Sequence, residues 1–365
     1  MVTVKPANKT TLLDETLRRI EPVDVSWIKR AEARQLELTK PPGSLGRLEG
    51  VANRCAGIFR TLSFSLERLR IVVFAADHGV CAEGVSAYPQ SVTGQMVLNF
   101  LGGGAAINCL AQAGGIDLQV VDVGVATSLP PLENLVQRRI APGTRNFCIE
   151  PAMTADEMLS AVHVGIEMAE QAAADGCDLL GFGEIGIGNT TPASALTAAL
   201  TGLPAVAVVG RGAGADDACL ARKISVVERA LALHSQSLKD PLEMLMHIGG
   251  LEIAAMTGFC LGCAANRLPV LMDGFIATCA AALAVRMHSS VQDYLFASHG
   301  SVEPGHRHLL ALLGQRPLLD LEMRLGEGTG AALSMKLVQA AAVAFTRMST
   351  FSSAGVSGRT TPGCA

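Results

Sequence analysis

One unit recurs along most of the chain: a short β-branched apolar run, a glycine-rich polar turn and an alanine-rich stretch of helical character. Parallel strands need a long crossover connection, usually a helix, whereas antiparallel strands can be joined by tight turns. The alternation therefore predicts an α/β fold with a mostly parallel sheet. We expect a doubly wound, three-layer αβα arrangement of the Rossmann-like type, in which helices cover both faces of the sheet.

Seven apolar runs are predicted to be the strands of this sheet, which leaves a closed (β/α)₈ barrel as an alternative. Most of the runs end in a turn rich in glycine, with acidic, basic or histidine residues. Ligands of open parallel sheets bind beyond the carboxyl ends of the strands, so we expect these turns to converge on one site. The predicted strands are residues 70–75, 118–123, 179–182, 205–209, 270–272, 293–297 and 318–325.

The length of 365 residues favours one large domain with a smaller one attached to it. A hydrophobic content of 49% with only 4% aromatic residues suits helices packed closely on a sheet. We predict a small helical domain that begins with residues 1–65, an α/β substrate-binding domain over residues 66–328, and a C-terminal helix over residues 329–351 that packs with the small domain. Residues 352–365, which are rich in serine, glycine and threonine, are predicted to be a flexible tail.

Charge and targeting signals point to a small-molecule partner. The net charge is −4 and the basic residues are dispersed, which argues against binding to nucleic acid or to a membrane surface. The first residues lack an apolar core for a secretory signal, so we expect a cytoplasmic protein with reduced thiols. Of the ten cysteines, only Cys260 and Cys263 form a CxxC, and burial is the favoured interpretation over a metal or redox role.

The histidines do not have the spacing of a metal site. His78 and His299 are each followed by glycine, and neither has a second ligand at HxH or HxxxH spacing, so capping or supporting hydrogen bonds are favoured over metal ligation. His306 and His308 lie two positions apart and are expected on a solvated surface. No metal and no cofactor is predicted.

Residues 181–186 match the pattern GxGxxG directly after a predicted strand. The acidic residue of a dinucleotide site is missing at the end of the next predicted strand, where Arg211 stands between two glycines. An NADP-dependent oxidoreductase is therefore an alternative, and a general phosphate cradle at a helix start is the favoured interpretation over simple tight packing. Lys223 lies beyond Asp216, a predicted helix cap, and is either a counter-charge for phosphate or a surface lysine.

Residues 79–90 form a long irregular segment after a predicted strand, which is typical of a binding loop or lid.

Glu327 is the second distinctive feature, because it stands between Gly326 and Gly328 after the last predicted strand. The missing neighbouring side chains would let ligand atoms approach the backbone closely. A functional carboxylate is favoured over a charge partner for the N-terminus of the following helix.

Taken together, eight segments in one order resemble the nicotinate-nucleotide:dimethylbenzimidazole phosphoribosyltransferase family of cobalamin synthesis. The resemblance extends from Lys40 to about Lys336, and Ile185 departs from it where methionine is expected. The segments are KPPGSLGRLE (40–49), AADHGV (75–80), EGVSAYPQ (83–90), GEIGIGNTTPASA (183–195), GRGAG (210–214) followed by ARK (221–223), DGFI (273–276), ASHGS (297–301) and RLGEGTGA (324–331).

The resemblance implies that nicotinate mononucleotide and 5,6-dimethylbenzimidazole are converted to α-ribazole 5′-phosphate and nicotinate, by a homodimer. Glu327 corresponds to the family's catalytic glutamate, which takes a proton from the incoming base. The resemblance also places Glu184 near the sugar, Gly186 and Lys223 near the phosphate, Ser301 and Arg324 near the nicotinate, and Ser86, Tyr88 and Gln90 against the aromatic base. A non-catalytic nucleotide-binding protein is the remaining alternative to this transferase.

Overall fold

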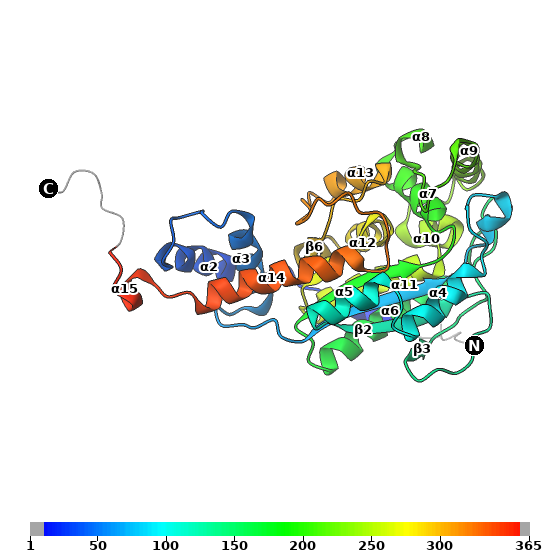
Figure 1. Cartoon of the computed structure of the whole chain (residues 1–365). Helices are drawn as coiled ribbons and strands as arrows, with labels where there is room; N and C mark the ends of the chain where they lie inside the picture. The colour runs from blue at the N-terminus through cyan, green and yellow to red at the C-terminus, as the bar shows by residue number, and fades with distance from the viewer. Residues whose placement is uncertain (1–10, 358–365) are drawn as a thin grey trace, which may run out of the picture.

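The computed structural model describes residues 11–357, and in this part of the chain six strands form one open sheet with helices on both faces (Figure 1). The order is β3-β2-β1-β4-β5-β6 and every neighbouring pair is parallel, which is the strand order of doubly wound nucleotide-binding sheets. The α/β prediction is confirmed and the barrel is excluded. The strands are β1 (Leu69–Ala76), β2 (Asp117–Gly124), β3 (Leu135–Gln137), β4 (Leu179–Ile185), β5 (Val270–Met272) and β6 (Leu295–Ala297).

Two predicted strands are wrong. Residues 205–208 form the short helix α8 (Ala205–Val208). Hydrophobic periodicity does not distinguish a strand from a buried helical turn in so short an apolar run. Residues 318–325 are irregular, with Glu322 at φ +55°, and make only an isolated bridge between Leu319 and His299. The side chains of Leu321 and Leu325 are exposed. In the predicted run 293–297 the strand begins only at Leu295, after a 3₁₀ turn. The short strand β3 was not predicted.

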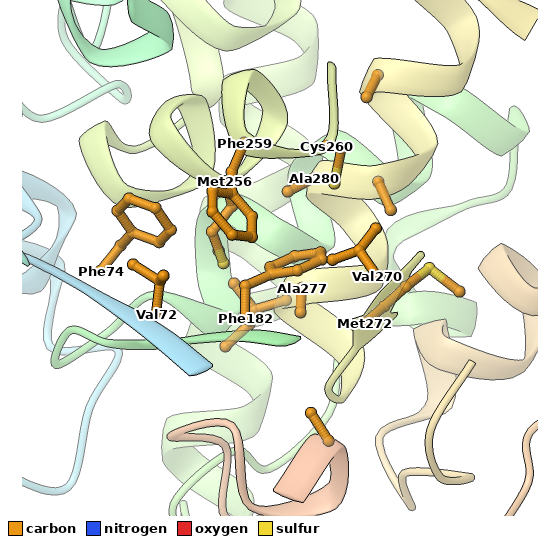
Figure 2. Close-up of a cluster of buried hydrophobic side chains, with 14 of the residues drawn as sticks. Val72, Phe74, Phe182, Met256, Phe259, Cys260, Val270, Met272, Ala277 and Ala280 are labelled. Carbon is orange, nitrogen blue, oxygen red and sulfur yellow. The ribbon is translucent and has the colours of Figure 1, made fainter. Parts of the chain in front are cut away.

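Helices α6 (Ala155–Ala174), α11 (Leu251–Ala265) and α12 (Phe275–Met287) cover one face of the sheet. Figure 2 shows Phe74 of β1 and Phe182 of β4 directed at Phe259 of α11, with ring centroids 5.7 and 5.8 Å apart. This edge-to-face packing buries large apolar surfaces at the centre of the sheet, where removal from water stabilises the fold most.

Helices α4 (Val92–Leu101), α5 (Ala106–Gly114) and α14 (Thr329–Arg347) cover the opposite face. Gly181 and Gly183 of β4 point to this side, because side chains alternate along a strand. A Cβ on Gly183 would overlap the backbone of Gly328, and one on Gly181 would lie 2.9 Å from Met335 Cε. The two glycines therefore let the start of α14 approach the sheet closely.

The N-terminal region forms α1 (Leu12–Arg19), α2 (Val25–Glu37) and α3 (Arg47–Phe59). Helix α14 runs from the sheet to α2 and α3, where Arg34 Nε donates to Phe345 O at 3.2 Å (Figure 1). Helix α1 instead packs on α6 and α11. Of the predicted tail, residues up to Ala354 lie in α15 (Phe351–Ala354), and residues 358–365 lie outside the described part of the chain.

The remaining helices gather mostly near the carboxyl end of the sheet (Figure 1). They are α7 (Thr190–Thr201), α9 (Asp217–Leu233), α10 (Pro241–Ile248) and α13 (Pro304–Leu312). One stretch, Val92–Gly114, is long and apolar enough by composition to cross a membrane, but residues 102–105 divide it into α4 and α5. Cys260 and Cys263 are fully buried in α11, and burial raises the pKa of both thiols.

Candidate active site

A cavity of about 660 Å³ opens beyond the carboxyl ends of the strands. Its walls come from segments far apart in the sequence. They are residues 85–96 after β1, residues 184–190 at and beyond the end of β4, the loop 211–215, the starts of the segments after β5 and β6, and residues 324–327. The prediction that the turns after the strands converge is therefore confirmed for most of them. Such a crevice is where open parallel sheets bind ligands.

Eight of the nine residues predicted for the site line this cavity. The exception is Gln90, whose side-chain amide lies 3.5 Å from the backbone oxygen of His78 and faces the loop rather than the cavity. The eight lining residues are Ser86, Tyr88, Glu184, Gly186, Lys223, Ser301, Arg324 and Glu327.

Glu327 has a strained backbone. Its φ is +65°, between Gly326 at +85° and Gly328 at +86°, so three consecutive residues are left-handed. A non-glycine residue pays about 1 kcal/mol or more for this conformation, which persists at functional sites when the surroundings enforce it. The side chain is buried, and its Oε2 has no hydrogen-bond partner. Burial raises the pKa of Glu327 to about 6, against a smaller opposing effect of the Ile107 backbone.

Asp273, rather than Glu327, is the charge partner for the N-terminus of α14. Its carboxylate accepts hydrogen bonds from the backbone N–H groups of Gly328 at 3.0 Å, Gly330 at 2.7 Å and Ala331 at 3.1 Å. These are donors of the first turn of α14, which have no partner inside the helix. Because Asp273 satisfies them from the end of β5, the Glu327 carboxylate is left free to face the cavity.

Glu184 is a second buried carboxyl in the wall of the cavity. Burial raises its pKa well above the usual range, and the nearby Glu252 and Asp273 act in the same direction. The Asn189 side chain donates a hydrogen bond to Oε2 and opposes this effect. Gly326 has φ +85°, which favours glycine, and a Cβ there would also lie 2.6 Å from Glu184 Oε1. The direction of this shift favours the protonated carboxyl, which can donate a hydrogen bond.

Lys223 is a buried ammonium group, not a surface lysine. It is 1% exposed, and its Nζ donates to Thr190 Oγ1 at 2.8 Å and to Gly210 O at 3.0 Å. Burial lowers its pKa, and the carboxylate of Glu303 counteracts this effect. An ammonium group has three N–H donors, so one remains for a ligand.

Two further charged side chains hold the loop beside Lys223. Gly212 N–H donates to Glu303 Oε1 at 2.8 Å, and Arg324 donates to Gly212 O at 3.1 Å. Gly212 has φ +53°, and a Cβ there would lie 3.0 Å from Thr190 Oγ1. The loop is therefore fixed on both sides at a position that only glycine fits easily.

The GxGxxG pattern proves to be two different features. Gly181 and Gly183 belong to β4 and serve packing against α14, as the alternative interpretation held. The turn itself begins at Gly186, whose Cβ would overlap Ala76 O. Ile187 N–H donates to Thr93 Oγ1 at 3.0 Å, and this hydrogen bond connects the turn to α4. Gly186 and Gly188 remain as the part that lines the cavity.

The histidines support the site from within the protein. His78 is fully buried with Nε2 2.8 Å from Glu252 Oε1, and His299 lines the cavity with Nδ1 3.8 Å from Asp273 Oδ1. The expectation for His306 is wrong: it is 1% exposed, because α13 packs on α12. No group of three potential metal ligands occurs among residues 11–357.

The cavity residues that were not predicted for the site include Asn189, Thr190, Glu303 and Phe275. Asn189 and Thr190 stand at the start of α7, where polar residues are usual as helix caps. Glu303 precedes Pro304, and nothing local distinguishes it from a helix-capping acid. Its partner Gly212 is 91 residues away, so only the tertiary structure reveals the contact.

The sheet order, the glycine-rich turn with a buried lysine and the convergent carboxyl groups are typical of a nucleotide-binding α/β enzyme. The phosphoribosyltransferase family profile matches residues 20–356. The chain is a member of the nicotinate-nucleotide:dimethylbenzimidazole phosphoribosyltransferase family.

Proteins of this name match nearly the whole chain. The protein of Geobacter sulfurreducens is 51% identical over 346 residues, which are 95% of this chain and 98% of that protein. The protein of Chloroflexus aggregans is 52% identical over 347 residues, again 95% and 98%. The crystal structure of the Thermus thermophilus protein has a TM-score of 0.87 at 51% identity and covers 92% of this chain and 100% of its own. An oxidoreductase and a non-catalytic protein find no support among these relatives.

Proposed function

We propose that the chain transfers the 5-phosphoribosyl group from nicotinate mononucleotide to 5,6-dimethylbenzimidazole, as the names of its relatives describe for those proteins. The single observation that carries the proposal is the position of Glu327, a buried carboxyl with a free oxygen in the same cavity as the buried ammonium of Lys223. A base and a cation in one cavity suit a substrate pair of which one member loses a proton and the other carries a phosphate.

The chemistry requires one bond to form and one to break at C1′ of the ribose. The unprotonated benzimidazole nitrogen attacks C1′, and the bond between C1′ and the nicotinate nitrogen breaks with inversion. The electron pair of that bond returns to the pyridine ring and discharges its positive charge. The attacking ring becomes positive, and the proton on its other nitrogen passes to Glu327.

The other side chains of the cavity bind and orient the substrates in this proposal. Lys223 uses its third N–H, together with the turn at Gly186, for the phosphate. Glu184, whose protonated form is favoured by burial, donates a hydrogen bond to the sugar. As the resemblance implies, Ser301 and Arg324 face the nicotinate, and Ser86 and Tyr88 contact the incoming base. All four line the same cavity, which supports this proposal. Gln90 acts only by holding the segment that carries Ser86 and Tyr88.

The direct test is to incubate the protein with nicotinate mononucleotide and a panel of benzimidazoles without added metal. We expect release of nicotinate and formation of α-ribazole 5′-phosphate, identified by mass. A series of bases without any release would refute the proposal. The ranking of the bases would also identify the preferred one, because a cavity discriminates single methyl groups only weakly.

We also infer that the protein works as a homodimer in the cytoplasm. The inference rests on the resemblance to a family of cobalamin-synthesis enzymes. Mass determination by light scattering at assay concentration should give twice the chain mass of 37.9 kDa. A monomeric mass in an active sample would exclude the dimer.

A further inference from the structure

A buried hydrogen-bonded chain lies behind the cavity and has no role in the proposed reaction. His306 lies in the first turn of α13, and its Nδ1 accepts the backbone N–H of Ser301 at 2.8 Å. Its Nε2 lies 2.9 Å from Oγ1 of Thr278 on α12. The imidazole and Thr278 are both almost completely buried. One ring therefore ties two packed helices to the turn Ser301–Glu303.

The contacts determine where the ring carries its hydrogen. An N–H group points at Nδ1, so this nitrogen must offer its lone pair, and the hydrogen must sit on Nε2 and point to Thr278 Oγ1. A doubly protonated ring would set two N–H groups against each other at Ser301. Burial lowers the pKa of His306 to about 3, and the ring of His299, 6.2 Å away, acts in the same direction.

The turn held by His306 supplies two walls of the cavity. Ser301 and Glu303 both line it, and Glu303 N–H donates to Ser301 Oγ at 3.4 Å. The Glu303 carboxylate in turn accepts the N–H of Gly212. The backbone oxygens of Gly210 and Gly212 accept hydrogen bonds from Lys223 and Arg324, respectively. A displacement of this turn would thus reach the loop at which the phosphate is proposed to bind.

We propose that His306, with its hydrogen on Nε2, is a positioning residue for nicotinate mononucleotide: its Nδ1 holds the turn Ser301–Glu303, and through this turn it holds Ser301 and the Gly212 loop in the binding geometry. The inference rests on the proposed function for the identity of the ligand. His306 itself does not face the cavity and touches no substrate.

Two substitutions separate the two nitrogens of the ring. In His306→Asn the amide oxygen reaches the position of Nδ1 and can still accept the Ser301 N–H, whereas the longer side chain in His306→Gln reaches the position of Nε2 instead. We expect His306→Gln to weaken binding of nicotinate mononucleotide about tenfold, as for one lost buried hydrogen bond. We expect His306→Asn to stay within about threefold of the wild-type protein.

The measurement is the Kd of nicotinate mononucleotide by calorimetry, together with separate KM values for nucleotide and base. The nucleotide values should change while kcat and the KM of the base stay nearly constant. His308→Gln is the matched control, because it makes the same change two residues further along α13 at a side chain outside this chain of hydrogen bonds. A second route, Thr278→Val, removes the partner of Nε2–H with little change of shape and should also raise the nucleotide KM.

A double variant distinguishes positioning from a general loss of structure. If His306 acts through the turn, the effect of His306→Gln on Kd should shrink when Ser301 is already alanine. An unchanged Kd in His306→Gln, or an equal loss in His306→Asn, would overturn the proposal. Failure of the proposed reaction would be seen differently, as an absence of nicotinate release by the wild-type protein. The binding measurements would still test the role of His306 in that case.

Discussion

Glu327 combines two local costs, a left-handed backbone and a buried carboxyl without a full set of partners. A stable packing role would need neither of them. Sites that carry function commonly retain such costs because activity depends on them. At the residue scale, Glu327 is therefore where activity and stability should respond to one substitution in opposite directions.

Glu327→Gln should stabilise the protein at neutral pH and slow its turnover. The folded-state pKa of about 6 lies above the ordinary 4.5, so ionisation costs stability once the pH rises above 4.5, and the full cost is present above about 6. This difference corresponds to about 2 kcal/mol. The urea midpoint of the variant should exceed that of the wild-type protein at pH 8, and the two should be equal at pH 4.

Turnover of Glu327→Gln should fall by about 10²-fold to 10⁴-fold, which is typical for loss of a general base. The KM of nicotinate mononucleotide should change little, because the proton is taken from the other substrate. Turnover at the wild-type rate would remove Glu327 from the role of base. A destabilised variant at pH 8 would show that the charge of Glu327 is satisfied in the free protein.

The pH dependence of the reaction follows from the same residue. Glu327 accepts a proton only when ionised, so kcat/KM for the base should rise with pH and level off above about 6. The benzimidazole also takes up a proton in acid, and the residual rate of Glu327→Gln over the same range corrects for it. A flat corrected profile between pH 5 and pH 7 would contradict the assignment.

At the scale of elements, the closest packing occurs between α6 and α11. A Cβ on Gly165 would overlap Ala255 O, and one on Gly258 would overlap Val162 O, so the two helices touch through their backbones. Such contact leaves no flexible side chain to move aside. Helix α11 of this pair packs directly on the central strands β1, β2 and β4.

Gly258→Ala should lower the free energy of unfolding by about 1 to 3 kcal/mol, because the helices must separate to admit a methyl group. Gly50→Ala is the control, since Gly50 lies in the exposed part of α3 with no atom within 4 Å of the new Cβ. This change should stabilise by about 0.5 to 1 kcal/mol through helix propensity. Urea unfolding measures both, and equal effects would refute the packing argument.

Elements with a sustained hydrophobic pattern or a clear following turn were predictable from the sequence. The secondary structure of the short apolar runs was not. β1, β2, β4 and β5 were predicted nearly as they occur, since each combines β-branched residues with a following turn. Residues 205–208 follow the same local pattern, but they pack as α8 against α7, α9 and α13. The division into a helical and an α/β domain stays a prediction, because α14 contacts both the sheet and α3.

At the scale of the molecule, the sheet order brings segments from residue 85 to residue 327 into one cavity. Ligand binding there should stabilise the whole fold. Nicotinate mononucleotide at about 100 times its Kd should add about 2.7 kcal/mol to the free energy of unfolding. Thermal unfolding with and without the nucleotide measures this, and Lys223→Met should lose most of the shift. An equal shift in both proteins would exclude Lys223 from phosphate binding.

The sequence by itself determined the α/β class, the glycine-rich turns, the distinctive carboxylate at Glu327 and the family resemblance. These depend on local periodicity, backbone freedom and motif order, which are properties of neighbouring residues. Only the tertiary structure decided that Lys223 is buried, that Asp273 caps α14 and leaves Glu327 free, and that His306 supports Ser301. Each of these joins residues distant in sequence, and burial, which sets their charge and hydrogen bonds, exists only once the chain has folded.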